Sequence, residues 1–369
     1  MTHEDYMRKA LALARKGMGF TSPNPMVGAV IVRDGEIIGT GYHKKYGDLH
    51  AERTAFAYCD ERGIDCTGAD MYVTLEPCCH HGKQPPCTEA VIAHGIKRVF
   101  VGSSDPNPLV AGKGTQILRS HGIEVTEGVL KEECDALNEI FFHFITTGLP
   151  FVTMKYAMTL DGKIACYTGE SKWITGEAAR AHVQQERLRH SAIMAGVGTV
   201  LADDPMLTCR LENGRDPIRI ICDSSLRTPL DSNIVRTAKQ VPTIIATVSE
   251  DSARAAEYEA AGCRIIKTSA KDGHVDLSAL MKLLGSEKID SILLEGGGEL
   301  NWSALREGIV SKVQAYIAPK LFGGSGKTPI GGTGVPFPSE AFMLEKCSVT
   351  SVGEDILIES RVKNVHGNN

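Results

Sequence analysis

One histidine and two cysteines near the start of the chain have side chains that could bind a metal ion together. His50 is followed two residues later by Glu52, and Cys78 and Cys87 lie further along the chain. One imidazole and two thiolates supply three ligands to zinc and leave the fourth tetrahedral position for water. Glu52 is not needed as a ligand, so its carboxylate can move protons. We therefore predict a catalytic zinc site with His50, Cys78 and Cys87 as ligands and Glu52 as the catalytic acid and base.

The spacing of these residues bears on the kind of zinc site. H-x-E followed by P-C is typical of zinc-dependent hydrolytic deaminases, although the gap between Cys78 and Cys87 is longer than in the simplest C-x-x-C form. A closed structural site would need a fourth protein ligand, which His80 or His81 could supply. Glu52 would have no purpose in such a site, so the catalytic interpretation is favoured.

Short helices and strands must position these side chains. We expect a helix over residues 50–58 with Asp48 as its N-cap, and a buried strand over residues 71–75 that leads to the first cysteine. A second helix over residues 88–94 would place Cys87 at its N-terminus, where unpaired amides stabilise a thiolate.

The rest of the first half alternates strands and helices. This alternation is typical of an α/β layer fold. Asn24 precedes the first strand of an expected hairpin, where it either forms a turn or faces a substrate; we predict a substrate contact. The expected elements are helices over residues 6–16 and 115–120, hairpin strands over 26–32 and 36–39, and strands over 98–102 and 123–126.

Length and composition restrict the class of protein. The 369 residues are enough for two domains, and 42% hydrophobic and 23% charged residues are ordinary for a globular protein. A net charge of −5 argues against nucleic acid as a partner. We expect no membrane segment and no secretory signal, and eleven irregularly spaced cysteines suit reduced thiols, so a cytoplasmic location is predicted.

The second half begins after a linker at residues 146–150. A helix that ends near Arg189, with Thr175 as its N-cap, is expected after the first strand. The glycines Gly296, Gly297 and Gly298 lie between a strand and a helix, where backbone amides can bind phosphate, but they do not form the G-x-G-x-x-G of a Rossmann domain. The other expected elements are strands over 151–158, 191–197, 218–223, 243–247, 264–268 and 289–294, and helices over 253–261 and 277–284.

Several motifs together resemble one family, the bifunctional deaminase–reductases of riboflavin biosynthesis. The resemblance covers nearly the whole chain, and the long loop between the cysteines is that family's form of the zinc loop. Cys79 stands where the family carries a serine. The motifs are Ser22-Pro23-Asn24-Pro25, His50-Ala51-Glu52, Thr74-Leu75-Glu76-Pro77-Cys78, Gly82-Lys83-Gln84-Pro85-Pro86-Cys87 and Asp105-Pro106-Asn107-Pro108-Leu109-Val110-Ala111-Gly112.

This resemblance implies a fold and two reactions. Residues 1–147 are expected to form a cytidine-deaminase-like three-layer α/β domain, and residues 150–369 a dihydrofolate-reductase-like α/β domain. The first would deaminate 2,5-diamino-6-(5-phosphoribosylamino)pyrimidin-4(3H)-one with Zn2+. The second would use NADPH to reduce the ribosyl group, which yields 5-amino-6-(5-phosphoribitylamino)uracil.

The resemblance also implies contacts in the second half. By local sequence alone Trp173 could be a core residue, and Arg187 and Arg210 could be surface charges, although an arginine pair suits a sugar phosphate. Lys155, on the first strand of this half, is a further candidate substrate contact. The implied NADPH contacts are Ala157, Trp173, Thr199, Asp203, Ser224, Gly296, Gly297, Gly298, Glu299 and Leu300. The implied substrate contacts are Ser171, Arg187, Leu207, Arg210 and Glu295.

Two alternatives from other classes stay open at this point. One is a zinc deaminase for another nucleobase or for nucleic acid, with a non-catalytic second domain; the acidic chain without a basic, aromatic stripe disfavours it. The other is a zinc-bound regulatory protein with a degenerate site. We expect a pyrimidine ribosyl phosphate as the small-molecule partner, and a homo-oligomer.

Overall fold

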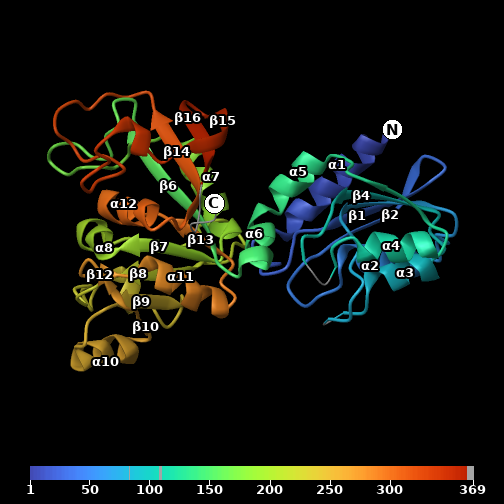
Figure 1. The fold of residues 1–369 in the computed structure, drawn as a ribbon, viewed down its shortest axis with the longest axis horizontal. Helices are drawn as coiled ribbons and strands as arrows, with labels where there is room; N and C mark the ends of the chain where they lie inside the picture. Colours follow the sequence, from blue (N-terminus) through green and yellow to red (C-terminus); the bar gives the residue numbers. More distant parts are fainter. Residues whose placement is uncertain (83, 108–109, 364–369) are drawn as a thin grey trace. The chain divides into compact units, whose positions relative to one another are not determined.

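A computed structural model of the chain describes residues 1–82, 84–107 and 110–363. Lys83, Pro108 and Leu109, which belong to two of the quoted motifs, lie outside the described residues. The chain divides into two compact units, Met1–Gly148 and Leu149–Asn369 (Figure 1). None of the helices in the described ranges has the length and hydropathy that crossing a membrane requires.

The first unit is built on a five-stranded sheet in the order β2-β1-β3-β4-β5. Helices α1 and α5 lie on one face and α2, α3 and α4 on the other, which makes three layers (Figure 1). The strands are β1 (Gly28–Arg33), β2 (Glu36–Tyr42), β3 (Asp70–Leu75), β4 (Arg98–Ser103) and β5 (Glu124–Glu127). The helices are α1 (His3–Ala14), α2 (Ala51–Asp60), α3 (Cys87–Ala93), α4 (Lys113–Ser120), α5 (Lys131–Leu137) and α6 (Glu139–Thr147).

Two helix starts differ from the expected ones. Asp48 is not the N-cap of α2: its N–H donates to Lys45 in a turn, while the extended His50 is the N-cap and its carbonyl accepts the N–H of Thr54 at 2.9 Å. Likewise Gly176, not Thr175, is the N-cap of α7 (Glu177–Arg189). In each case the residue expected to cap lies too early for its carbonyl to begin the helical hydrogen bonding.

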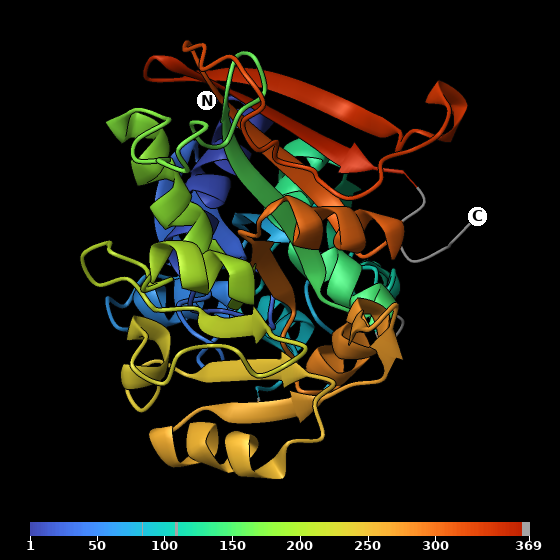
Figure 2. The same cartoon turned by 90° about the vertical axis from the view of Figure 1, so that its left-hand side faces the viewer.

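The second unit contains a nine-stranded sheet in the order β10-β9-β8-β7-β13-β6-β14-β16-β15. Figure 2 shows β15 and β16, in red, at one edge and β10 at the other. The strands are β6 (Phe151–Thr159), β7 (Ala192–Gly196), β8 (Ile218–Cys222), β9 (Thr243–Thr247), β10 (Arg264–Lys267), β13 (Ser291–Leu294), β14 (Val310–Ala318), β15 (Leu344–Val352) and β16 (Asp355–Val362); β11 (Ala270–Lys271) and β12 (His274–Val275) pair separately.

Helices cover both faces of this sheet. One apolar cluster packs α11 and α12 against it, and another packs α8, α9 and α10 against the opposite face. Adjacent residues of β8 show this alternation, because Ile220 belongs to the first cluster and Ile221 to the second. The helices besides α7 are α8 (Val197–Asp203), α9 (Asn233–Arg236), α10 (Ser252–Ala261), α11 (Leu277–Ser286) and α12 (Gly298–Arg306).

Candidate functional site

The three predicted metal ligands lie together in the first unit. The ligand atoms of His50, Cys78 and Cys87 all lie within 4.8 Å of one another. His50 Nδ1 is 3.4 Å from Cys78 Sγ and 3.5 Å from Cys87 Sγ. Tetrahedral zinc with ordinary bond lengths separates a nitrogen and a sulfur ligand by about 3.6 Å. The donor set and its spacing therefore fit zinc.

Local backbone structure explains why these side chains converge. His50 precedes α2 in an extended conformation, so its imidazole does not follow the helical spacing that would turn it away from Glu52. Cys87 is the first residue of α3, and its N–H donates to Cys78 Sγ at 3.4 Å. Arg53 holds the loop between the cysteines, because its guanidinium donates to the carbonyls of Pro85 and Pro86 at 3.0 and 2.8 Å.

The two thiols differ in their electrostatics. Hydrogen bonds from the Cys87 thiol and from His50 to the sulfur lower the pKa of Cys78 to about 4, although burial opposes this. Cys87 donates its proton toward Cys78, and this contact, with burial and the charge of Glu52, raises the pKa of Cys87. A divalent cation would offset the repulsion between two thiolates, so this site is suited to bind one.

Glu52 lies on the first turn of α2 and is only 3% exposed. Burial raises the pKa of its carboxyl to about 7, and the neighbouring Cys78 thiolate acts in the same direction. A carboxyl with a pKa near neutrality can both accept and donate a proton. The predicted acid and base is therefore buried beside the predicted ligands.

His43 is a residue of this site that the sequence analysis missed. Its Nε2 lies 3.5 Å from Asn24 Nδ2, and its ring packs edge-on against His50 with 5.4 Å between centroids. Its Nδ1 is 3.1 Å from the Leu49 carbonyl, and burial lowers its pKa, which favours the neutral imidazole. Asn24 therefore lies one side chain away from a metal ligand. Only the position of His43 directly after β2 could have drawn attention to it.

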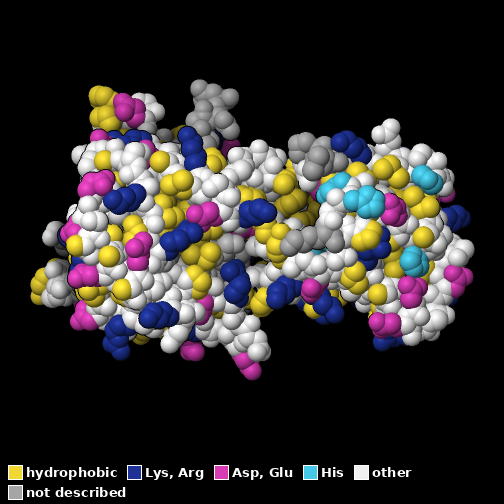
Figure 3. All heavy atoms as spheres, turned by 90° about the horizontal axis from the view of Figure 1, so that it is seen from below, with side chains coloured by type: hydrophobic (Ala, Val, Ile, Leu, Met, Phe, Trp, Pro, Cys, Tyr) yellow, Lys and Arg dark blue, Asp and Glu magenta, His cyan; other side chains and the backbone are white. Residues whose placement is uncertain are grey.

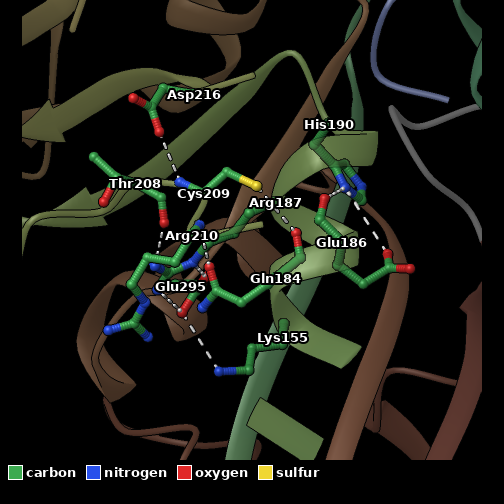
Figure 4. A network of polar contacts seen from close by, with 10 residues as sticks. All are labelled: Lys155, Gln184, Glu186, Arg187, His190, Thr208, Cys209, Arg210, Asp216 and Glu295. Atoms are coloured by element: carbon green, nitrogen blue, oxygen red, sulfur yellow. Dashed lines mark hydrogen bonds and ion pairs between the residues drawn. The ribbon is translucent and has the colours of Figure 1, made fainter. Parts of the chain in front are cut away.

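A second group of charged side chains meets in the other unit, at the end of β13. Glu295 accepts two hydrogen bonds from Arg187, at 2.7 and 3.1 Å, and one from Lys155 at 3.4 Å (Figure 4). Burial alone raises the pKa of Glu295, but the two cations outweigh it and lower the pKa to about 2. Arg187 also donates to the Thr208 carbonyl at 2.9 Å. Glu295 is thus a fixed carboxylate.

Arg187 and Arg210 differ in what they can bind. The side chain of Arg187 is 14% exposed and is engaged with Glu295 and Thr208, so it is not a surface charge. Arg210 lies beside this group in Figure 4; it is exposed, and its backbone N–H donates to the Gln184 side chain at 2.9 Å. Its guanidinium is therefore the better placed of the two to bind a ligand.

Two helices of this unit begin at a glycine where neighbouring parallel strands end. Gly196 precedes α8 after β7, Gly297 precedes α12 after β13, and neither helix has a side-chain cap. A Cβ on Gly297 would lie 3.9 Å from Thr199 Oγ1. The structure therefore brings Thr199 to the predicted loop of Gly296, Gly297, Gly298, Glu299 and Leu300. The amides at the start of α12 can bind a phosphate.

The other predicted contacts are more scattered. Asp203 is the exposed last residue of α8. Trp173 is 60% exposed, so it is not a core residue, and the Arg180 guanidinium lies 4.8 Å from its ring. Leu207 is 4% exposed and belongs to the apolar cluster between the sheet and α9. A ligand would thus meet the backbone of Leu207 rather than its side chain.

Three further predicted residues are half-buried. Ser224 follows β8, and its hydroxyl accepts the N–H of Val275 at 3.2 Å. Ala157 lies on β6 and packs against a cluster that contains Tyr316. Ser171 lies in the segment before α7. Within the described part of the chain, no hydrogen bond joins any of these three residues to Glu295.

The surface of the second unit gives no sign of a polyanion partner on the face seen in Figure 3. Basic and acidic side chains are interspersed there rather than gathered by sign. This mixture agrees with the net charge of −5 and offers no basic stripe for a nucleic-acid backbone on that face.

Two family models match the chain, one in each unit. The cytidine and deoxycytidylate deaminase zinc-binding region matches residues 1–103, and the RibD C-terminal domain matches residues 150–358. The chain is 58% identical to the riboflavin biosynthesis protein RibD of Actinobacillus pleuropneumoniae, over 97% of this chain and 95% of that protein. It is 40% identical to RibD of Escherichia coli K12, over 97% and 99%.

Solved structures agree with these matches. A diaminohydroxyphosphoribosylaminopyrimidine deaminase/5-amino-6-(5-phosphoribosylamino)uracil reductase from Thermotoga maritima has a TM-score of 0.83 and 38% identity, over 98% of each chain. RibD of Acinetobacter baumannii has a TM-score of 0.85 and 35% identity, over 98% and 99%. The predicted fold class and bifunctional activity are confirmed, and the alternatives are not favoured. The chain belongs to the RibD family, the zinc- and NADPH-dependent deaminase–reductases of riboflavin biosynthesis.

Proposed function

We propose that residues 1–147 catalyse the deamination and residues 150–369 the reduction, of which 364–369 lie outside the described part. The substrate of the first step would be the diaminopyrimidine ribosyl phosphate named for the Thermotoga maritima protein. The convergence of His50, Cys78 and Cys87 around a buried Glu52 carries this proposal. The positions of the two family matches, 1–103 and 150–358, support the division.

In the deaminase unit, each residue has a distinct role. A zinc ion bound by His50, Cys78 and Cys87 would lower the pKa of water toward neutrality. The carboxylate of Glu52 would take the two protons of the attacking water in turn, passing the first to the ring nitrogen and the second to the departing ammonia. Asn24 would orient the pyrimidine; its Nδ2 lies 3.5 Å from Nε2 of His43, which supports this role.

In the reductase unit, we assign binding and orientation to this chain's residues. NADPH would supply the hydride that reduces C1′ of the opened ribose. The uncapped start of α12, from Gly297, binds a cofactor phosphate. Lys155 and Arg187 fix Glu295 beside the substrate. The guanidinium of the exposed Arg210 would bind the ribose phosphate in bidentate fashion. The other proposed contacts to NADPH are Thr199, Asp203, Ser224, Trp173 and Ala157.

A pair of cysteine variants tests the metal assignment. We expect Cys87→Ser to lose bound zinc and ammonia release, because one of three ligands is gone, while reduction of the deaminated intermediate continues. Cys79→Ser is the matched control, since it changes the adjacent thiol to the serine typical of the family, and zinc content and ammonia release should stay at the wild-type level. Wild-type zinc content and activity in Cys87→Ser would refute the ligand set.

Three expectations concern the whole protein. The small-molecule partner is a pyrimidine ribosyl phosphate, in keeping with the family. A homo-oligomer and a cytoplasmic location stay predictions. Sedimentation of the purified protein would test the predicted homo-oligomer, because a purely monomeric species at working concentration contradicts that prediction.

A further inference from the structure

Arg219 of β8 is a fully buried arginine in the second unit. Its exposed fraction is 0%, and it lies on the same face of the sheet as Ile221, toward α9. Arginine is almost never fully buried unless it is paired, yet the six hydrogen bonds of this guanidinium all go to neutral acceptors. They are the carbonyls of Met206 (3.2 Å), Ile234 (3.0 Å) and Val241 (3.1 Å), and the hydroxyls of Thr237 (2.8 Å) and Thr243 (3.0 and 2.7 Å).

These acceptors come from three separate segments. Met206 lies in the loop after α8, Ile234 and Thr237 belong to α9 and its C-terminal end, and Val241 and Thr243 lead into β9. The rigid, planar fork of a guanidinium can satisfy all of them at once, whereas the three donors of a lysine ammonium cannot. Arg219 therefore joins the loop after α8 to α9 and the sheet.

The loop that Arg219 holds, residues 203–210, has an unfavourable backbone. Asp204 and Leu207 both adopt positive φ, at 39° and 49°, which is uncommon for residues other than glycine. Such a conformation persists where surrounding contacts fix it. A second contact acts on the same loop, because Asn233 of α9 donates to the Asp204 carboxylate from its backbone at 2.8 Å and from its side chain at 2.9 Å.

The same loop carries much of the proposed reductase site. It contains Asp203 and Arg210, and its Thr208 carbonyl accepts from Arg187, the residue that holds Glu295 (Figure 4). A displacement of Met206 would therefore move three groups together: the proposed NADPH contact Asp203, the proposed substrate contact Arg210, and the Thr208 carbonyl that helps to fix Arg187.

We propose that Arg219 is a positioning residue of the reductase, which fixes the loop of residues 203–210 in the conformation that binds NADPH and substrate. The inference rests on the function proposed for this loop. Arg219 acts through Met206 and α9 and touches no reacting group. Its effect should appear in ligand binding by the folded enzyme, and not in the deaminase reaction of the same chain.

The test is Arg219→Lys in the full-length protein, with both activities measured on the same preparation. We expect KM for NADPH and for the deaminated intermediate to rise about tenfold, the cost of roughly one lost hydrogen bond to the loop, while KM and kcat for ammonia release stay unchanged. Arg264→Lys is the matched control, because Arg264 lies on β10 and pairs with Glu287 at the surface; it should leave both reactions unaltered.

A split between KM and kcat distinguishes positioning from simple stability. Partial unfolding removes active molecules, so it lowers the apparent kcat of reduction with KM unchanged, and that result overturns the proposal. If Arg219→Lys does not fold, the second variant is Asn233→Ala, which removes the side-chain hydrogen bond from α9 to Asp204 of the loop. An unchanged KM of the reductase in Asn233→Ala also overturns the proposal. Arg210→Ala tests whether the loop itself contacts the substrate. An unchanged KM for the intermediate in Arg210→Ala refutes the proposed substrate contact. A raised KM in Arg210→Ala together with an unchanged KM in Arg219→Lys refutes only the positioning role of Arg219.

Discussion

The buried charge cluster around Glu295 should contribute strongly to the stability of the second unit. The side chain of Glu295 is 12% exposed, and those of Lys155 and Arg187 are 15% and 14% exposed. The change Glu295→Gln keeps the shape of the side chain but removes its charge. Two buried cations then lose their counterion, which is more costly than the loss of an exposed ion pair.

The magnitude follows from the pKa of the carboxyl. Its ordinary value is 4.5, and the two cations lower it to about 2 in the folded protein despite burial. A carboxyl whose pKa falls in this way on folding adds about 3 kcal/mol to the free energy of unfolding at neutral pH. This contribution is present above pH 4.5, where the unfolded chain is also ionised, and is lost as the pH falls toward 2.

Tryptophan fluorescence can measure this change selectively, because both tryptophans, Trp173 and Trp302, lie in the second unit. In urea titrations at pH 7 we expect Glu295→Gln to reduce the free energy of unfolding by about 3 kcal/mol. The matched control is Glu250→Gln, whose partner Lys267 and own side chain are exposed, and which should cost less than about 1 kcal/mol. Equal losses of unfolding free energy in Glu295→Gln and Glu250→Gln would refute the reasoning. So would a difference in unfolding free energy between Glu295→Gln and the wild type that does not shrink below pH 4.5.

Two further variants test how the zinc loop is supported. Gly114→Ala should make the deaminase inactivate at a lower temperature, because the new Cβ would lie 2.2 Å from the Pro77 carbonyl, next to Cys78; heat stability equal to the wild type contradicts this close approach. Glu76→Gln should cost about 1–3 kcal/mol in the first unit, since its buried carboxylate accepts three backbone N–H groups. A deaminase as heat-stable as the wild type would show that these contacts add little. The three donors are Asp105 (3.3 Å), Gly112 (3.0 Å) and Thr115 (3.2 Å).

Periodicity and turn residues were enough to predict most strands of both sheets. The hairpin of β1 and β2 follows from alternating apolar residues around Asp34-Gly35, and the structure has β2 directly after that turn. Helices α5, α6, α8 and α9 were missed, and so were three strands of the second sheet, β14, β15 and β16. The expected linker at residues 146–150 overlaps the last turn of α6, which ends at Thr147 with Gly148 in the left-handed region. The chain after Gly196 continues as helix α8 rather than strand, because its first turn packs Val197 and Val200 into the core.

The deaminase centre could be predicted more fully than the reductase site. Ligand chemistry restricts a zinc site to few residue types, so His50, Cys78 and Cys87 could be predicted as ligands from type and spacing, and the structure brings them together. No such restriction applies to Arg219 or His43, whose importance comes from burial and from partners distant in sequence. Arg187 is engaged with Glu295 whereas Arg210 is exposed, and this difference likewise depends on Glu295, which is more than 80 residues away in sequence from either arginine.

The most direct test of two separate sites in one chain is Glu52→Gln assayed with each substrate in turn. We predict that the zinc-loaded variant releases ammonia from the diaminopyrimidine substrate at least about a hundredfold more slowly than the wild type. Given that substrate, it therefore oxidises almost no NADPH. Given the deaminated intermediate, it should oxidise NADPH at the wild-type rate. Ammonia release near the wild-type rate with zinc bound, or a matching loss of NADPH oxidation with the intermediate, would contradict the account.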